Sequence, residues 1–430
     1  MDFDEGPDFD DFSVEMEDFE VRQVKKFDRT FSIKTGGSFS QKPLVHDGLV
    51  YVGCMDQHLY AIDAKTGEVK WRFKMEGGVY VSSPVISDGI IYVGSYDHNL
   101  YAVDARSGKP VWKFQTRDKV LSSAFVHGDR VYFGSNDYNL YCLDKRTGEL
   151  VWKFKTQGEV VSTPVIHKWN VFFGSYDHLL YCLDAESGRL VWKFETQGDI
   201  FNTTPFLINE DIIYFDSFDN YMRAVDINTG QLVWKFLTGR YGMQDGPIMH
   251  NGILYQTNRE GVLYALTLSG KIIWEFRIND IIARPIIHGD RIYLGTGDYN
   301  LYCLDLRTGK VLWKFPTQGE LWWKPAVWDD RIYFTSMDCF LYCLDIGTHK
   351  VIWKLRGQGE TSPMTSPFDS FELVVKKRTE ESGMEEKEGR KRYNIDAFEE
   401  QRGSFYKSRI TYQMSTQYRE KGKYQSDEEF

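Results

Sequence analysis

Three basic residues occupy one repeated place in this 430-residue chain, immediately before a proline. They are Lys42, Arg284 and Lys324, whereas the matching places elsewhere hold small residues such as Ser83 and Thr163. Like charges brought into a confined place cost free energy unless an anion offsets them. The pattern therefore predicts an anion-binding site, which we expect to include three further residues: Arg240, Trp322 and Trp323.

Two interpretations of these cations stay open. Asp245 and Glu320 are candidates to pair with them locally, and in that case nothing else binds. Otherwise the site receives an anionic small molecule, an acidic peptide or the acidic end of the chain itself. Weaker binding of a carboxylate ligand after replacement of Arg284 and Lys324 by Ala would favour the second interpretation.

No set of residues in the sequence suits catalysis. The nine histidines fall largely at turns of a repeat, and the repeated aspartates are better explained as turn caps than as calcium ligands. These aspartates are Asp56, Asp97, Asp137, Asp177, Asp219, Asp298 and Asp338. The chain has no adjacent cysteines, no phosphate-binding glycine loop and no nucleophile motif. We therefore expect no catalytic residue, no metal site and no cofactor.

The elements that position the cations follow from a tryptophan that returns every 39 to 42 residues. The eight are Trp71, Trp112, Trp152, Trp192, Trp234, Trp274, Trp313 and Trp353. Each repeat contains four short runs rich in Val, Ile, Tyr and Phe, which predict β-strands. In the second repeat these runs are Ser83 to Ile86, Ile90 to Gly94, Leu100 to Asp104 and Pro110 to Phe114.

Four antiparallel strands in about forty residues are the size of one propeller blade. The predicted fold is all-β, an eight-bladed β-propeller of four-stranded antiparallel blades. We expect each tryptophan to lie on the outermost strand and to pack against the neighbouring blade, as a docking motif. Ring closure makes the seventh, eighth and first blades neighbours, so Lys42, Arg284 and Lys324 should meet near the mouth of the central channel.

The repeated phrase Leu-Tyr-x-x-Asp, Thr-Gly and Trp resembles the repeats of pyrroloquinoline-quinone (PQQ)-type propellers over roughly residues 39–357. The matching segments are Leu59 to Trp71, Leu100 to Trp112, Leu140 to Trp152, Leu180 to Trp192 and Leu301 to Trp313. That family includes quinoprotein dehydrogenases, a lipoprotein of outer-membrane assembly and cofactor-free members. In the dehydrogenases the resemblance implies a vicinal disulfide, a calcium site and a catalytic carboxylate. Because this chain lacks adjacent cysteines, it resembles a cofactor-free cytoplasmic member.

The net charge of −10 belongs to one end of the chain. Residues 1–20 contain ten acidic residues and no basic one, and the other 410 residues hold 52 acidic and 52 basic residues. We divide the chain into an acidic disordered end over 1–28, the propeller over 29–365 and a charged extension, partly disordered or docked, over 366–430. The balanced charge of the body argues against nucleic acid as a partner.

The start of the chain and its cysteines predict where the protein is located. No apolar stretch follows a basic start, so we expect no leader and no membrane insertion. Cysteines at one repeated slot indicate reduced thiols and a cytoplasmic setting, and these are Cys142, Cys182, Cys303 and Cys343.

We expect a non-catalytic scaffold for protein–protein interaction, which meets unidentified partners through its acidic end or its C-terminal extension. The alternatives are a binding module for an anionic small ligand or quinone-type cofactor at the channel mouth, and the sensor arm of a signalling system.

Overall fold

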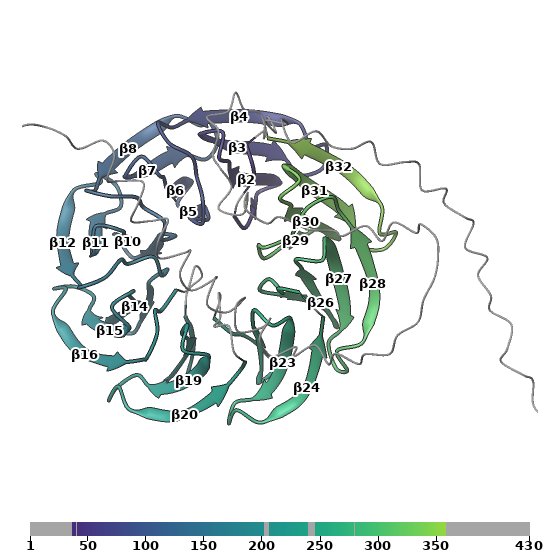
Figure 1. The fold of residues 1–430 in the computed structure, drawn as a ribbon. Helices are drawn as coiled ribbons and strands as arrows, with labels where there is room; N and C mark the ends of the chain where they lie inside the picture. Colours follow the sequence, from purple (N-terminus) through teal and green to yellow (C-terminus); the bar gives the residue numbers. More distant parts are fainter. Residues whose placement is uncertain (1–36, 40, 202–205, 240–245, 279, 358–430) are drawn as a thin grey trace, which may run out of the picture. The chain divides into compact units, whose positions relative to one another are not determined.

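The computed structural model describes residues 37–39, 41–201, 206–239, 246–278 and 280–357. These residues form 32 strands in eight four-stranded antiparallel sheets, arranged as the blades of a ring (Figure 1). No helix among the described residues is long and apolar enough to cross a membrane. The prediction of an all-β, eight-bladed propeller is confirmed.

The strands are numbered in chain order, four to a blade. The innermost strands are β1 (Leu44–His46), β5 (Val85–Ser87), β9 (Phe125–His127), β13 (Val165–His167), β17 (Leu207–Asn209), β21 (Ile248–His250), β25 (Ile286–His288) and β29 (Ala326–Trp328). The second strands are β2 (Leu49–Gly53), β6 (Ile90–Gly94), β10 (Arg130–Ser135), β14 (Asn170–Gly174), β18 (Ile212–Asp216), β22 (Ile253–Thr257), β26 (Arg291–Gly295) and β30 (Arg331–Thr335).

The third and fourth strands complete each blade. The third strands are β3 (His58–Asp63), β7 (Asn99–Asp104), β11 (Asn139–Asp144), β15 (Leu179–Asp184), β19 (Tyr221–Asp226), β23 (Val262–Thr267), β27 (Asn300–Asp305) and β31 (Phe340–Asp345). The outermost strands are β4 (Val69–Lys74), β8 (Pro110–Gln115), β12 (Leu150–Lys155), β16 (Leu190–Glu195), β20 (Leu232–Leu237), β24 (Ile272–Arg277), β28 (Val311–Pro316) and β32 (Val351–Arg356).

The core lies between blades, so the middle strands are buried on both faces. In β11, Leu140 and Cys142 pack toward the fourth blade, while Tyr141 and Leu143 pack toward the second. All four side chains are at most 5% exposed. A strand covered on both faces needs apolar residues at consecutive positions, which explains the continuous runs in the sequence.

The innermost strands are shorter than the sequence predicts. The run from Ser83 to Ile86 was expected as a strand, but β5 begins only at Val85. Pro84 has no N–H to donate to a ladder, and the backbone N–H of Ser83 donates to Ser123 Oγ of the next blade instead. The residues before each proline therefore belong to the links between blades rather than to the sheets.

At most seams between blades, the indole N–H of an outermost tryptophan donates to a carbonyl in a turn of the following blade. At the seam of the second and third blades, Trp112 Nε1 and Tyr92 Oη both donate to the Lys145 carbonyl, at 3.0 and 3.1 Å. Gly148 closes this turn with φ +73°, and a Cβ there would lie 2.7 Å from the Trp112 ring. The same indole-to-carbonyl bond is made by Trp71, Trp152, Trp192, Trp234 and Trp353.

The eighth blade departs from this seam geometry. His349 stands where the other turns have glycine, with φ +59°, and its ring lies 4.4 Å from the ring of Trp313. Trp313 Nε1 is buried without a hydrogen-bond partner. A ring–ring contact therefore replaces the indole-to-carbonyl bond at the seam of the seventh and eighth blades.

The eighth blade meets the first directly, so every blade is built from one continuous segment. Trp353 Nε1 and Tyr333 Oη donate to the Ala64 carbonyl at 3.1 and 3.0 Å, and Thr335 Oγ1 donates to the Gln41 carbonyl at 3.2 Å. Among the described residues no strand is exchanged between blades. Figure 1 shows β32 beside β4 at this junction.

The repeated aspartates hold turns and link neighbouring blades. Asp177 accepts hydrogen bonds from the backbone N–H of Gln157 and Leu179 and from the Tyr181 hydroxyl. In the fifth blade Asp219 instead forms a bidentate, buried ion pair with Arg223. These aspartates therefore recur in the sequence because they hold the turns and link the blades.

Candidate functional site

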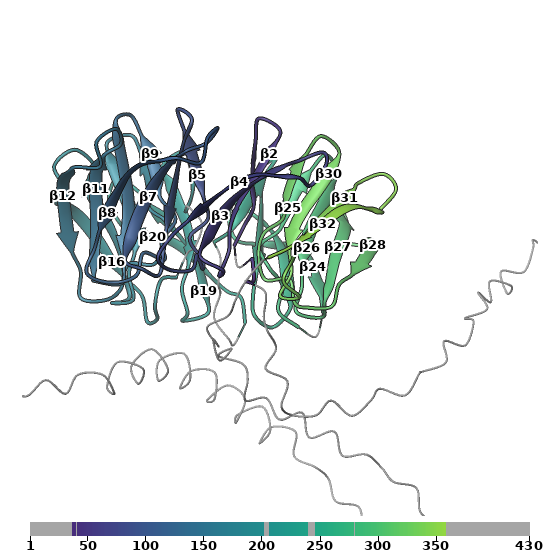
Figure 2. The same ribbon diagram turned by 90° about the horizontal axis from the view of Figure 1, so that it is seen from above.

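The three predicted cations lie on the links that lead into the innermost strands. Lys42 precedes β1, Arg284 precedes β25 and Lys324 precedes β29, and β29 contacts both β1 and β25. These links share one face of the ring with the turns between second and third strands, here called the connecting face. Figure 2 shows the ring edge-on, with its connections at the two faces. We call Lys42, Arg284 and Lys324 the cation site.

Lys42 and Arg284 influence each other across the eighth blade. Burial lowers the pKa of Lys42, and the Arg284 guanidinium lowers it further. No carboxylate of the described residues contributes to this shift. Arg284 is 8% exposed, and its Nη2 donates to the Pro247 carbonyl at 2.8 Å. The ring therefore brings together two positive charges that are 242 positions apart in the sequence.

The structure describes Lys324 and the proposed partner Glu320, but not Arg240 or Asp245. Lys324 lies on the eighth blade, between the blades of Lys42 and Arg284. Arg240 and its possible partner Asp245 fall outside the described residues. Burial raises the pKa of Glu320, the other proposed partner, and the side chains that act on it are Trp322 and Asp280. Among the residues that the structure describes, no cation acts on this carboxyl.

Trp322 and Trp323 belong to an aromatic cluster near the axis of the ring. Trp323 is buried and meets Tyr80 of the second blade edge to face, with ring centres 6.0 Å apart. Tyr80 in turn contacts Tyr96 at 5.9 Å. We call the whole set the axial cluster, and it consists of Tyr80, Val81, Tyr96, Leu121, Val161, Tyr176, Phe201, Trp322 and Trp323.

The axial cluster continues to the sixth blade through an arginine. Phe201 contacts Tyr176 and stacks on Phe218, each at 6.0 Å, and the Arg259 guanidinium lies 4.9 Å from the centre of the Phe218 ring. Burial raises the pKa of Tyr80 and Tyr176, and Arg259 opposes that shift in both. One arginine thus acts on tyrosines of the second and fourth blades, so these side chains converge on the axis.

Sequence reasoning missed most of this cluster. Tyr96, Tyr176, Phe218 and Arg259 all lie in turns between second and third strands. In three of these turns the residue directly precedes a repeated aspartate (Asp97, Asp177 and Asp219), and its identity changes from blade to blade. That variation beside a constant residue is the signal in the sequence that would have indicated a shared surface.

A group of carboxylates lies on the connecting face between the second and fifth blades. Burial raises the pKa of Glu159 to about 7; Asp118 and Asp199 raise it too, and Lys119 opposes them. Asn136 Nδ2 donates to Glu159 Oε2 at 2.9 Å. The connecting face therefore has the cation site at blades seven, eight and one, and an acidic region, formed by Glu159, Asp118 and Asp199, across the ring from it.

The cysteines of the described residues are not suited to covalent chemistry. All six cysteines are free and buried, and burial raises the pKa of the Cys142 and Cys182 thiols to about 12. A thiol rather than a thiolate is a poor nucleophile. No group of three or more His, Cys, Asp or Glu residues in the described ranges could hold a metal ion.

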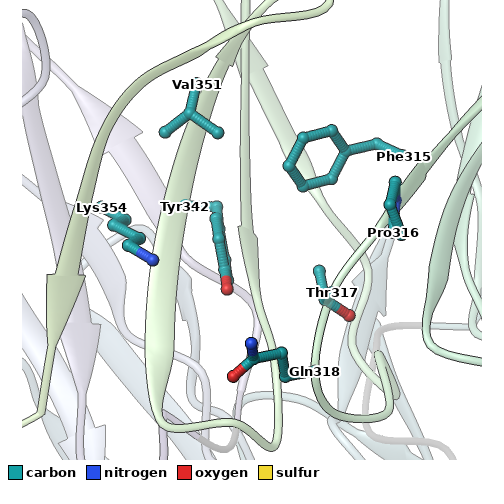
Figure 3. Close-up of a pocket in the computed structure, with 7 residues that line it drawn as sticks. All are labelled: Phe315, Pro316, Thr317, Gln318, Tyr342, Val351 and Lys354. Atoms are coloured by element: carbon teal, nitrogen blue, oxygen red, sulfur yellow. The ribbon is translucent and has the colours of Figure 1, made fainter. Parts of the chain in front are cut away.

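A separate groove lies on the outer rim between the seventh and eighth blades. Its volume is about 530 Å³, and Figure 3 shows the seven side chains around it. They are Phe315, Pro316, Thr317, Gln318, Tyr342, Val351 and Lys354. The Lys354 ammonium lies 4.6 Å from the Phe340 ring, so this groove combines apolar walls with one charged edge.

Known proteins resemble this chain over most of the propeller. The crystal structure of BamB from Moraxella catarrhalis superposes with a TM-score of 0.60 and 19% identity, covering 69% of this chain and 94% of that one. Quinohemoprotein alcohol dehydrogenase from Comamonas testosteroni superposes with a TM-score of 0.61 and 16% identity, covering 70% of each chain. The computationally designed protein Ika8 gives 0.64 and 16% identity, over 72% of this chain and 96% of Ika8. At these identities the likeness shows the fold alone.

Sequence comparison gives a shorter match and a longer one. The shorter is with 1-butanol dehydrogenase (quinone) of Thauera butanivorans, 31% identical over 84 residues, which are 17% of this chain and 14% of that protein. The longer is with a family model described as outer membrane protein assembly factor BamB, which matches residues 28–94, 74–166, 101–202, 140–354 and 258–404. The repeats, the eight blades and this match together show that the chain belongs to that family of PQQ-like repeat propellers.

Proposed function

We propose that this protein is a non-catalytic binding scaffold whose cation site receives carboxylate groups of an acidic protein partner. The observation that carries the proposal is the meeting of Lys42 and Arg284. Burial and mutual repulsion both disfavour the charged form of Lys42, and no described carboxylate opposes them. A bound carboxylate would offset the charge of Lys42, so the site gains free energy by accepting one.

The absence of a catalytic role is part of the same proposal. It is supported by the structural roles of side chains that could otherwise take part in catalysis. The repeated aspartates accept hydrogen bonds within and between blades, as Asp177 does. The cysteines are buried thiols with raised pKa, of which Cys142 is an example. Six free cysteines are also compatible with a reducing compartment, which supports the cytoplasm as the proposed location.

A small anionic ligand is the second candidate, and the axial cluster favours it. Tyr80 is a partly exposed aromatic residue of the connecting face, and the buried Trp323 packs against its ring; the two belong to blades that flank Lys42 on either side. A ligand with both a carboxylate and a ring system would use both kinds of contact. Isothermal titration with an octaglutamate peptide and with benzoate distinguishes the two, because only the peptide offers several carboxylates and no ring.

The experiment compares octaglutamate binding to the wild-type chain, Lys42→Met and Lys193→Met. Methionine keeps the length of the side chain and removes its charge, and Lys193 is an exposed cation of the outer rim. We expect about ten-fold weaker binding to Lys42→Met, since a charge-assisted hydrogen bond contributes about 1.5 kcal/mol or more. Lys193→Met should bind as the wild type does. Equal affinities in all three proteins would remove the cation site from the account.

A further inference from the structure

The acidic region of the connecting face contains an unused acceptor beside a carboxylate. Asn136 is 5% exposed and lies in the turn between β10 and β11. Its Nδ2 donates to Glu159 Oε2, while its Oδ1 is buried and has no hydrogen-bond partner among the described residues. A buried amide oxygen without a donor costs free energy of about 1–3 kcal/mol, so this position favours a ligand that brings a donor.

The groups around this pair define what kind of donor fits. Glu159 lies on the link between β12 and β13, and its backbone carbonyl accepts the N–H of Tyr176, a partly buried residue of the axial cluster. Asp118 and Asp199 add negative charge near Glu159. Acceptors, negative charge and an aromatic ring in one place are the features that recognise an organic ammonium group.

Lys119, the cation that acts on Glu159, is directed toward another residue. Lys119 acts on Glu159 electrostatically, but its ammonium lies over the Tyr96 ring, 5.0 Å from the ring centre. No ion pair joins Lys119 to a carboxylate among the described residues, and Asp199 pairs with His178, whose Nε2 lies 3.3 Å from Asp199 Oδ1. The Glu159 carboxylate therefore keeps its outer lone pairs for another donor.

We propose that Glu159 and Asn136 form a binding site for an alkylammonium group, with the Glu159 carboxylate as counter-charge and Asn136 Oδ1 as a second acceptor. The group comes either from a lysine side chain of a protein partner or from a small primary amine. This site is separate from the cation site and does not depend on the proposed function. Together they allow one partner to place a positive and a negative group on opposite sides of the same face.

The test is isothermal titration of the full chain with two amines and one neutral control. The amines are the peptide acetyl-Gly-Gly-Lys-Gly-Gly-amide and free pentylamine, and the control is the same peptide with norleucine in place of lysine. We expect saturable binding of at least one amine at pH 8 and none of the norleucine peptide. Tighter binding of the lysine peptide identifies a protein partner as the source, and tighter binding of pentylamine identifies a small amine.

Variants separate this site from a general attraction to acidic surface. Glu159→Gln keeps a side chain that accepts from Asn136 but lacks the charge, and it should weaken amine binding about ten-fold. Glu186→Gln removes an exposed carboxylate from the turn between β15 and β16, and it should leave the affinity for the amine unchanged. Lys119→Met should bind the amine as tightly as the wild type or more tightly, because a competing internal cation is gone.

Two results would overturn the proposal. One is equal loss of binding in Glu159→Gln and Glu186→Gln, and the other is absence of saturable amine binding in both the wild type and Lys119→Met. Octaglutamate binding serves as the internal reference, because it should be the same in Glu159→Gln and the wild type. Loss of octaglutamate binding with intact amine binding would count against the cation site alone.

Discussion

Replacing Gly148 by alanine should destabilise the propeller far more than replacing Gly128 of the same blade. Both glycines have positive φ, +73° and +55°, so alanine at either position carries a left-handed backbone cost of roughly 1–2 kcal/mol. Only at Gly148 would the new Cβ meet another side chain, at 2.7 Å from the Trp112 ring, whereas nothing lies within 4 Å of Gly128.

The additional cost at Gly148 comes from the indole that must move. Overpacking a tight contact costs about 1–3 kcal/mol, and the lost bond from Trp112 Nε1 to the Lys145 carbonyl adds about 1 kcal/mol. Gly148→Ala should therefore lower the free energy of unfolding by about 3–6 kcal/mol in total. If the ring unfolds as one unit, this is a fall in Tm of roughly 5–9 °C for a propeller of this size.

Differential scanning calorimetry of the wild type, Gly148→Ala and Gly128→Ala measures the difference. We expect Gly128→Ala to lose only about 1–2 kcal/mol, the backbone cost alone. Equal losses of unfolding free energy in the two variants would mean that the Trp112 ring can move away from the new Cβ without a cost in free energy. The seam between blades would then not depend on the contact between Trp112 and the turn of Gly148.

Three further predictions concern buried charge and buried thiols. Arg223→Met should cost about 3–5 kcal/mol in chemical denaturation because it strands the buried Asp219 carboxylate, and Arg223→Tyr, which restores the residue of the other blades, should cost less. Glu159 has its pKa raised to about 7 in the fold, so its contribution to stability is complete below its ordinary pKa of about 4.5 and is lost as the pH rises through 7. In chemical denaturation, Glu159→Gln should therefore match the wild type in free energy of unfolding at pH 4.5 and exceed it at pH 8.5, by about 1–2 kcal/mol after allowance for partial exposure. All six cysteines should resist Ellman's reagent at pH 8 in the native protein and react on unfolding, because burial keeps thiols such as Cys142 protonated, with a pKa of about 12; fast labelling of the native chain would contradict this.

The ring was predictable because its elements repeat. The repeat predicts the structure of one blade, because each unit of about forty residues has one tryptophan, four apolar runs and a glycine turn. The number of repeats then predicts the number of blades. Where a run was placed too early, at Ser83, the reason was a proline whose missing N–H excludes it from the ladder. Ring closure by direct contact of Trp353 with the Ala64 carbonyl was left undecided by the sequence, since either chain end contains strand-like segments.

The candidate site was predictable only in part. Lys42, Arg284 and Lys324 stand out because they break the repeat at one shared position, and the ring order then makes them neighbours. The axial cluster and the acidic region consist of residues on the links and turns of different blades, such as Tyr80 and Tyr176, that meet only near the axis. Such contacts depend on the reach of each side chain toward the axis, which periodicity does not encode.

The pKa of Lys42, measured by NMR of its side-chain nitrogen with and without octaglutamate, tests the cation site most directly. The free protein should show a value below the ordinary range for lysine, because burial and Arg284 both disfavour the ammonium form. Saturation with the peptide should move this pKa upward. Saturable binding with no movement of the Lys42 pKa would contradict the account, because the peptide would then be held elsewhere on the ring.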